Sequence, residues 1–192
     1  MNKSRIEAFS DGVMAIIITI MILEIKAPEH DEIGSLIPLI PVFLSYVMSF
    51  IYVGIYWNNH HHMFQVVKKI DGSVLWFNII LLFWLSLIPF ATNWIGSQSF
   101  SSVPMACYGF ILLMCAISYR LVQNKIIKLE GKESLLYKAV EKDKKGKISL
   151  VCYTSAIPLA FVSPIISGVL YVSVALMWIV PDRRIENQIN KI

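Results

Sequence analysis

The chain of 192 residues is 56% hydrophobic and only 16% charged, with a formal net charge of +4 and a mean hydropathy of +0.63. Soluble domains carry about 25% charged residues, so this composition excludes an ordinary soluble domain and indicates an integral membrane protein. The three cysteines all lie inside apolar runs. They form neither a disulfide framework nor a metal-binding pattern.

Four long apolar segments come first along the chain. Residues 5–26 are enough to cross a hydrocarbon core of about 30 Å at about 1.5 Å per residue. This segment is too long for the apolar region of a signal peptide and lacks a small-x-small cleavage site, so we expect a retained helix. Further spans are expected over residues 36–62, 72–94 and 102–127, with Pro89 near the end of the third.

The last apolar stretch, 148–180, is long for one span and short for two. Pro164 lies in its middle, and a proline inside a helical pattern ends or kinks the helix. We therefore expect two short spans, about 148–162 and 165–180. The predicted fold class is an all-α integral membrane protein with six transmembrane helices in a single domain, 1–192. Residues 128–147 would form a cytoplasmic loop, too small for a catalytic or nucleic-acid-binding domain.

Basic residues orient these spans. With six spans, the N-terminus, the second-to-third loop, the fourth-to-fifth loop and the C-terminus share one side, and those segments hold every lysine and arginine except Lys26. We expect that side to be cytoplasmic, so both termini face the cytoplasm of a multi-pass protein in the cell membrane. A five-span chain would place Arg183 and Arg184 outside. The charged run 124–147 is most simply a solvated, topology-setting face, with attraction to anionic lipid as the alternative.

The first helix presents a narrow stripe along one face. At about 100° per residue, that face holds Gly12, Ile16, Thr19, Ile20 and Leu23. One interpretation is packing against a neighbouring helix, because small residues let backbones approach. The other is a pore lining, because stacked rings of isoleucine and leucine can form a constriction that gates by dewetting. Periodicity alone leaves both open.

Asp11 is unexpected inside an apolar helix, because a carboxylate in a span is costly and normally faces a partner or water. Asp11 and Ser10 both lie off the stripe. Polar residues at the same expected depth occur at the end of the second span and the start of the third, and they are Trp57, Asn58, Asn59, His60, Trp76 and Asn78. We hypothesise that Ser10 and Asp11 hold the first helix to these two spans and leave the stripe free.

The residues Arg5-x-x-x-Phe9-Ser10-Asp11 resemble the first-helix signature of the transmembrane protein 175 family, potassium-permeable channels of endosomes and lysosomes with shorter bacterial relatives. The resemblance extends to Trp57-x-x-His60-His61, to Trp76-x-Asn78 and to Ile88-Pro89-Phe90. It covers the whole chain in length and span count. With one six-helix repeat, the chain is similar to the bacterial members.

The resemblance implies a homo-oligomer, expected as a tetramer, with a pore lined by the first helix and without a carbonyl filter. The family's hydrophobic constriction falls on Ile16, the next pore layers on Ile20 and Leu23, and its threonine on Thr19. An isoleucine ring offers no oxygen to replace hydration water, so potassium, which holds its water less tightly than sodium, passes more easily. The acids Glu24, Glu29, Asp31 and Glu32 would lie at the outer mouth, either as an ordinary polar loop or to concentrate cations.

Two short motifs point elsewhere. Tyr52-Val53-Gly54-Ile55-Tyr56 resembles a potassium-channel filter, but it lacks the preceding threonine run and lies inside a continuous span. His60-His61-His62 suggests a metal site, yet adjacent helical residues point about 100° apart and no second histidine lies four residues away. We therefore expect no metal and no cofactor besides the permeant potassium ion.

The predicted function is passive conduction of monovalent cations, weakly selective for potassium, in the lipid bilayer. We expect no enzymatic activity and no nucleic-acid partner. One alternative is a proton-coupled secondary transporter that uses Asp11 and His60 as a relay, although such carriers usually show paired helix breaks in two halves. The other is a membrane scaffold that docks partners through the basic segment 124–147.

Overall fold

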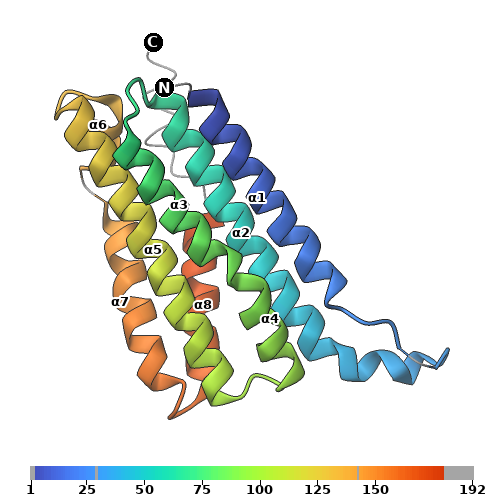
Figure 1. Cartoon of the computed structure of the whole chain (residues 1–192). Coiled ribbons are helices and arrows are strands. Elements are labelled where there is room, and N and C mark those ends of the chain that lie inside the picture. The colour runs from blue at the N-terminus through green and yellow to red at the C-terminus, as the bar shows by residue number, and fades with distance from the viewer. Residues whose placement is uncertain (1–2, 29, 142, 180–192) are drawn as a thin grey trace.

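The structure, a computed structural model, describes residues 3–28, 30–141 and 143–179, and over these residues all of its regular secondary structure is helical (Figure 1). Four charged residues whose side of the membrane was predicted from the sequence lie outside those residues: Arg183, Arg184, Lys191 and Glu29. The helices, in chain order, are α1 (Lys3–Leu23), the 3-10 helix η1 (Ile33–Leu39), α2 (Ile40–Val66), α3 (Gly72–Ser86), α4 (Ile88–Ser97), α5 (Ser102–Glu130), α6 (Leu135–Val140), α7 (Lys144–Leu159) and α8 (Pro164–Ile179).

The first two long helices differ from the predicted ranges at their ends. The first was expected over 5–26, but α1 ends at Leu23, directly before the charged and proline-containing residues Glu24, Lys26 and Pro28. The second was expected over 36–62, but α2 runs from Ile40 to Val66 and is preceded by η1, which contains Pro38. Through the filter-like residues 52–56 the helix is continuous.

The third predicted span, 72–94, is divided. α3 ends at Ser86, α4 begins at Ile88, and Pro89 lies in the first turn of α4. Proline has no backbone N–H and its ring clashes with the preceding turn, so the helix cannot continue through it undisturbed. Figure 1 shows the resulting offset between α3 and α4. The residues from Gly72 to Ser97 together remain long and apolar enough to cross a membrane.

The predicted loop 128–147 contains helical structure. α5 continues to Glu130, α6 fills Leu135–Val140, and α7 begins at Lys144 rather than 148, because the Asp143 side chain accepts a hydrogen bond from the Gly146 N–H and caps it. α7 ends at Leu159 rather than 162. Among the residues that the structure describes, four segments have by themselves the length and hydropathy of membrane spans, and α8 is apolar but shorter.

The core lies around α5, which packs against α3, α4, α7 and α8. Its largest fully buried side chains include Tyr52, Tyr108 and Tyr171. The Tyr52 hydroxyl donates to the Tyr171 carbonyl at 2.6 Å, and the Tyr171 hydroxyl donates to the Met105 carbonyl at 2.9 Å. Because hydrocarbon offers no partner to a polar group, these internal bonds let large aromatic side chains fill the bundle without a desolvation penalty.

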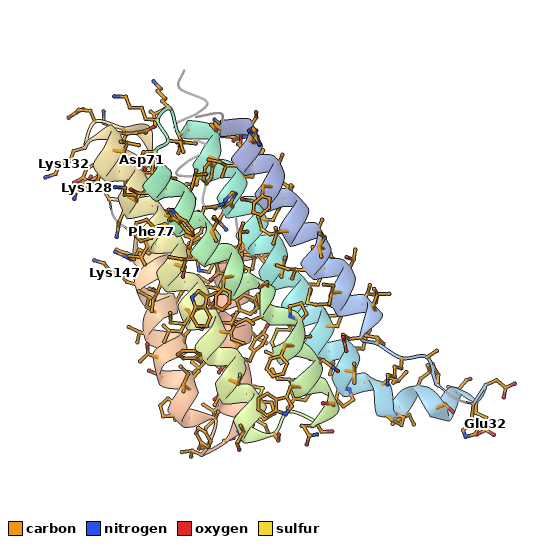
Figure 2. The ribbon with its side chains drawn as sticks, viewed as in Figure 1. Glu32, Asp71, Phe77, Lys128, Lys132 and Lys147 are labelled. Carbon is orange, nitrogen blue, oxygen red and sulfur yellow. The ribbon has the colours of Figure 1, made fainter. Side chains whose placement is uncertain are left out.

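α1 lies at the edge of the bundle, packed on α2, α3 and α4 (Figure 1). The segment with η1 projects from one end of the bundle. In Figure 2 its Glu32 lies at the opposite end of the molecule from Lys128 and Lys132. Among the described residues, one side of α1 is left uncovered.

Candidate functional site

The inner face of α1 is defined by five buried residues spaced three or four apart, Ile6, Ser10, Met14, Ile17 and Met21. This spacing keeps one side of the helix turned toward α2, α3 and α4. The structure therefore shows which side of α1 packs within the chain, a choice that periodicity alone left open.

The outer face of α1 carries the predicted stripe. The exposed fraction is 58% for Ile16, 42% for Ile20 and 80% for Leu23, and Gly12 and Thr19 are exposed as well. A Cβ atom added at Gly12 would meet nothing within 4 Å. Packing among the described residues 3–28, 30–141 and 143–179 therefore does not use the stripe, and no close approach among them explains the glycine.

The Thr19 hydroxyl has a defined orientation on that face. Its Oγ1 donates to the Ile16 carbonyl at 2.9 Å. A hydroxyl has one donor and two acceptor lone pairs, so this bond uses the hydrogen and leaves the oxygen as an acceptor. The stripe can thus present one partially negative oxygen per chain between layers of isoleucine and leucine.

A polar anchor joins the base of α1 to α2 and α3. The Asn78 amide Nδ2 donates to Ser10 Oγ at 2.9 Å, and the Asn78 Oδ1 lies 2.9 Å from His60 Nε2. An amide oxygen carries no hydrogen, so His60 Nε2 is the donor and holds the proton. All three residues are at least 98% buried. Outside this buried set, Trp57 Nε1 donates to Asp11 Oδ1 at 3.1 Å.

The remaining signature residues do not join the anchor. Arg5, Phe9 and Trp76 are exposed, Phe9 at 59% and Trp76 at 68%. Trp76 was a predicted partner of Asp11, but it precedes the buried Asn78 by two residues, which is about 200° around a helix. Only one of Trp76 and Asn78 can therefore face α1, and in the structure it is Asn78.

Two contacts near the ends of α1 were not predicted. The Lys3 ammonium donates to the Gln65 carbonyl at 3.2 Å and to the Val67 carbonyl at 3.4 Å. At the other end, Asn93 Nδ2 donates to Glu24 Oε2 at 2.8 Å. The available signal was Asn93 itself, a polar residue inside the apolar run of the third span. These bonds tie both ends of α1 to the rest of the chain.

The histidine run is used locally. The Gln65 side chain lies 2.7 Å from His61 Nε2 and 3.3 Å from His62 Nδ1, while His61 stacks on Trp57 at 6.0 Å between ring centroids. Within residues 3–28, 30–141 and 143–179, no three His, Cys, Asp or Glu side chains gather as a metal site. The contacts of His61 and His62 are thus local ones, made within α2.

At the α2–α3 turn, Asp71 accepts a hydrogen bond from the Val74 N–H at 2.9 Å, which caps α3. Asp71 Oδ2 also lies 3.6 Å from the Lys125 ammonium. The Val74 N–H lowers the pKa of this carboxyl, and the Lys125 charge lowers it further. The nearby Glu130 carboxylate accepts from the backbone N–H groups of Lys68 and Lys69. The far end of α5 thus fixes this turn.

Comparisons with known proteins found matches to the N-terminal helices and to nearly the whole chain. Residues 5–89 match the family model described as "Endosomal/lysosomal potassium channel TMEM175". A protein of Chryseobacterium sp. (strain P1-3) named as a potassium channel is 53% identical over 191 residues, with 100% of each chain covered. The "Endosomal/lysosomal proton channel TMEM175" of Rattus norvegicus is 34% identical over 131 residues, which cover 62% of this chain and 26% of the rat protein.

The fold is similar to a solved structure as well. The crystal structure of "a lysosomal potassium-selective channel TMEM175 homolog" from Chamaesiphon minutus superposes with a TM-score of 0.82 at 28% sequence identity. The match covers 94% of this chain and 97% of that one. The likeness therefore extends beyond residues 5–89 to nearly all of the helices.

Proposed function

We propose, from the premise that this chain belongs to the TMEM175 family, that it is a potassium channel in which the outer face of α1 lines the pore. The family and the relatives named above are channels, so the chain is a multi-pass membrane channel protein and not an enzyme. The identity of the pore-lining helix, the number of chains in the oligomer and the orientation in the membrane are what we propose.

One observation supports the lining role of α1 above all others. The stripe of Gly12, Ile16, Thr19, Ile20 and Leu23 is exposed, while the opposite side of the same helix is held by the buried anchor at Ser10. A single chain offers one such helix, so several copies must surround an axis, most simply by cyclic symmetry. We propose a homotetramer, in which four stripes face one another across the axis.

Selectivity in this pore comes from incomplete dehydration. A ring of Ile16 side chains presents only carbon, so a cation that passes it must keep part of its water or lose it without replacement. Potassium binds its water less tightly than sodium, so it crosses at a lower cost. A ring of Thr19 oxygens, free to accept, would stabilise a partly hydrated cation between the Ile16 and Ile20 layers.

For the membrane topology we propose six spans with both termini in the cytoplasm of the cell that makes the protein. Support comes from the distribution of charge: Lys128 and Lys132 lie at one end of the molecule and the acidic residue Glu32 at the other (Figure 2). The short helices α7 and α8 would be the fifth and sixth spans. Basic residues favour the cytoplasmic side.

The test is potassium flux from proteoliposomes with wild type, Ile16→Asn and Ile22→Asn. Ile22 is an exposed α1 residue off the stripe, 45% exposed, and serves as the matched control. Ile16→Asn should raise the flux and lower the preference for potassium over sodium at least severalfold, because amide groups hydrate the constriction. Ile22→Asn should leave both unchanged.

Two results would contradict this proposal, one for conduction and one for the lining role of the stripe. Absence of flux in the wild type at any potential would argue against conduction itself. Flux that responds equally to Ile16→Asn and Ile22→Asn would keep the channel and reject the stripe as its lining.

A further inference from the structure

A cavity of about 70 Å³ lies between α2, α5, α6, α7 and α8, away from the stripe on α1. One water molecule needs roughly 10–15 Å³ by this kind of measure, so the space admits several waters or the ring of one small ligand. Five aromatic side chains line it, namely Tyr52, Tyr56, Tyr119, Tyr153 and Trp178. Such a wall favours a flat apolar group, because rings pack in offset or edge-to-face contacts.

The rim of the cavity holds an ion pair whose nitrogen and oxygen atoms are farther apart than in a short hydrogen bond. Arg120 Nη1 lies 3.5 Å from Asp143 Oδ2, whereas a charge-assisted hydrogen bond is about 2.7–2.9 Å long. The Nη1 atom is buried, and within the described part of the chain it has no hydrogen-bond partner. A buried donor without an acceptor destabilises the folded protein, and an acceptor that enters the cavity would remove this cost.

The two sides of this pair define what the entering group must be. The guanidinium can only donate, and the carboxylate can only accept. An anionic group would oppose Asp143, and a cationic group would oppose Arg120. An uncharged hydroxyl satisfies both, because its oxygen accepts from Nη1 while its hydrogen goes to Oδ2. With these two atoms 3.5 Å apart, the hydroxyl reaches both of them from beside the pair.

We propose that this cavity is a binding site for a small phenol, with its ring among Tyr52, Tyr56 and Trp178 and its hydroxyl between Arg120 and Asp143. The site lies away from the pore that α1 would line, and ligand binding there does not depend on ion conduction. Because Tyr56 precedes Trp57, the donor to Asp11 of α1, an occupant would also contact the helix that anchors α1.

The direct test is fluorine NMR of 4-fluorophenol with the full-length protein in lipid nanodiscs, with protein-free nanodiscs as the baseline for partition into lipid. The second probe is 4-fluoroanisole, which keeps the ring and the acceptor oxygen but has no hydroxyl hydrogen. We expect saturable line broadening with the phenol. We expect at least about tenfold weaker binding of the anisole, because a hydrogen bond to a charged group contributes about 1.5–3 kcal/mol.

Three variants complete the design. Ala116→Leu fills the cavity from α5 without changing charge, and Arg120→Leu removes the donor. Lys128→Leu is the matched control, because it also removes one cation from α5 but is exposed and does not line the cavity. Phenol binding should fall to the baseline in Ala116→Leu, weaken at least about tenfold in Arg120→Leu and stay at the wild-type level in Lys128→Leu.

The proposal is overturned by wild-type protein that shows no saturable binding, by equal affinity for phenol and anisole, or by binding that survives Ala116→Leu. If Arg120→Leu fails to elute as the wild-type oligomer, Ala116→Leu and the anisole comparison still decide the result.

Discussion

At the scale of single residues, the buried amide of Asn78 makes more contacts between helices than the carboxylate of Asp11. Asp11 receives one hydrogen bond, from Trp57, in an exposed setting. Asn78 joins three helices, because it donates to Ser10 of α1 and accepts from His60 of α2 while it sits on α3. Removing it would leave a buried hydroxyl and a buried imidazole N–H without their partner. The contacts of His60 are those of a structural anchor, and a proton relay is not needed to explain its burial.

We therefore predict that Asn78→Ala lowers the free energy of unfolding by about 1–2 kcal/mol, the upper range for interhelical polar contacts in membranes. The matched change Asn93→Ala removes a similar amide from an exposed contact with Glu24 and should cost less than about 0.5 kcal/mol. Reversible unfolding in mixed detergent micelles, followed by circular dichroism, measures both. Equal losses would show that burial of the Asn78 contact has no special weight.

At the scale of elements, the helix ends are set by caps and breaks. Pro89 divides the third span, and the Asp71 carboxylate caps α3 while Lys125 and Glu130 of α5 reach the same turn. α5 thus holds the α2–α3 turn from beyond the apolar segment. Because α2 and α3 carry the partners of Ser10 and Asp11, this turn helps to set the spacing of the anchor.

The cap at Asp71 predicts a pH dependence of stability. Its pKa is lower in the folded protein than the ordinary value near 4. A carboxyl with a lowered folded pKa contributes stability above the unfolded pKa, and that contribution is lost as the pH falls through the folded pKa. The thermal midpoint of the wild type should therefore fall more steeply below about pH 4 than that of Asp71→Asn. Glu133→Gln, which removes an exposed carboxylate paired with Lys138, is the control.

Should the pH slopes of wild type and Asp71→Asn coincide in that window, the cap would not be the source of the dependence. Solvent exposure of Asp71 keeps the expected difference small.

At the scale of the whole molecule, the uncovered side of α1 must meet lipid, another copy or water. The stripe on that side is apolar with one threonine, and its residues are exposed among the part of the chain that the structure describes. In the proposed tetramer, the stripe faces a hydrated axis and the flanking residues face neighbours or lipid. Exposure to water is thus the property that separates a pore from a lipid-facing helix.

Cysteine substitution reads this property directly. In a background with the native cysteines replaced by alanine, cysteines at positions 16, 20 and 23 should react with aqueous thiol reagents and change the current, because a thiolate forms only in contact with water. A cysteine at position 22 should not react. Native mass spectrometry should give the tetramer. Reaction at 22 with silence at 16, 20 and 23 would place the pore on another face.

The sequence by itself determined the properties that are local. Hydropathy gave the apolar segments, Pro164 marked the break between the last two predicted spans, and the period of α1 separated the stripe from Ser10. The break at Pro89 was not predicted, because the third span was expected to be continuous over 72–94. It also supplied the polar candidates for the anchor. It did not choose between Trp76 and Asn78, because both are polar residues of the same span.

Only the tertiary structure decided which groups meet. Asp11 and Trp57 are 46 residues apart in the chain, and Ser10 and Asn78 are 68 apart, so no local pattern links them. The same holds for Arg120 and Asp143 at the cavity, and for Glu24 with Asn93. The physical reason is that helix formation depends on neighbours within about four residues. The pairing of buried polar groups, by contrast, depends on the register with which separate helices pack.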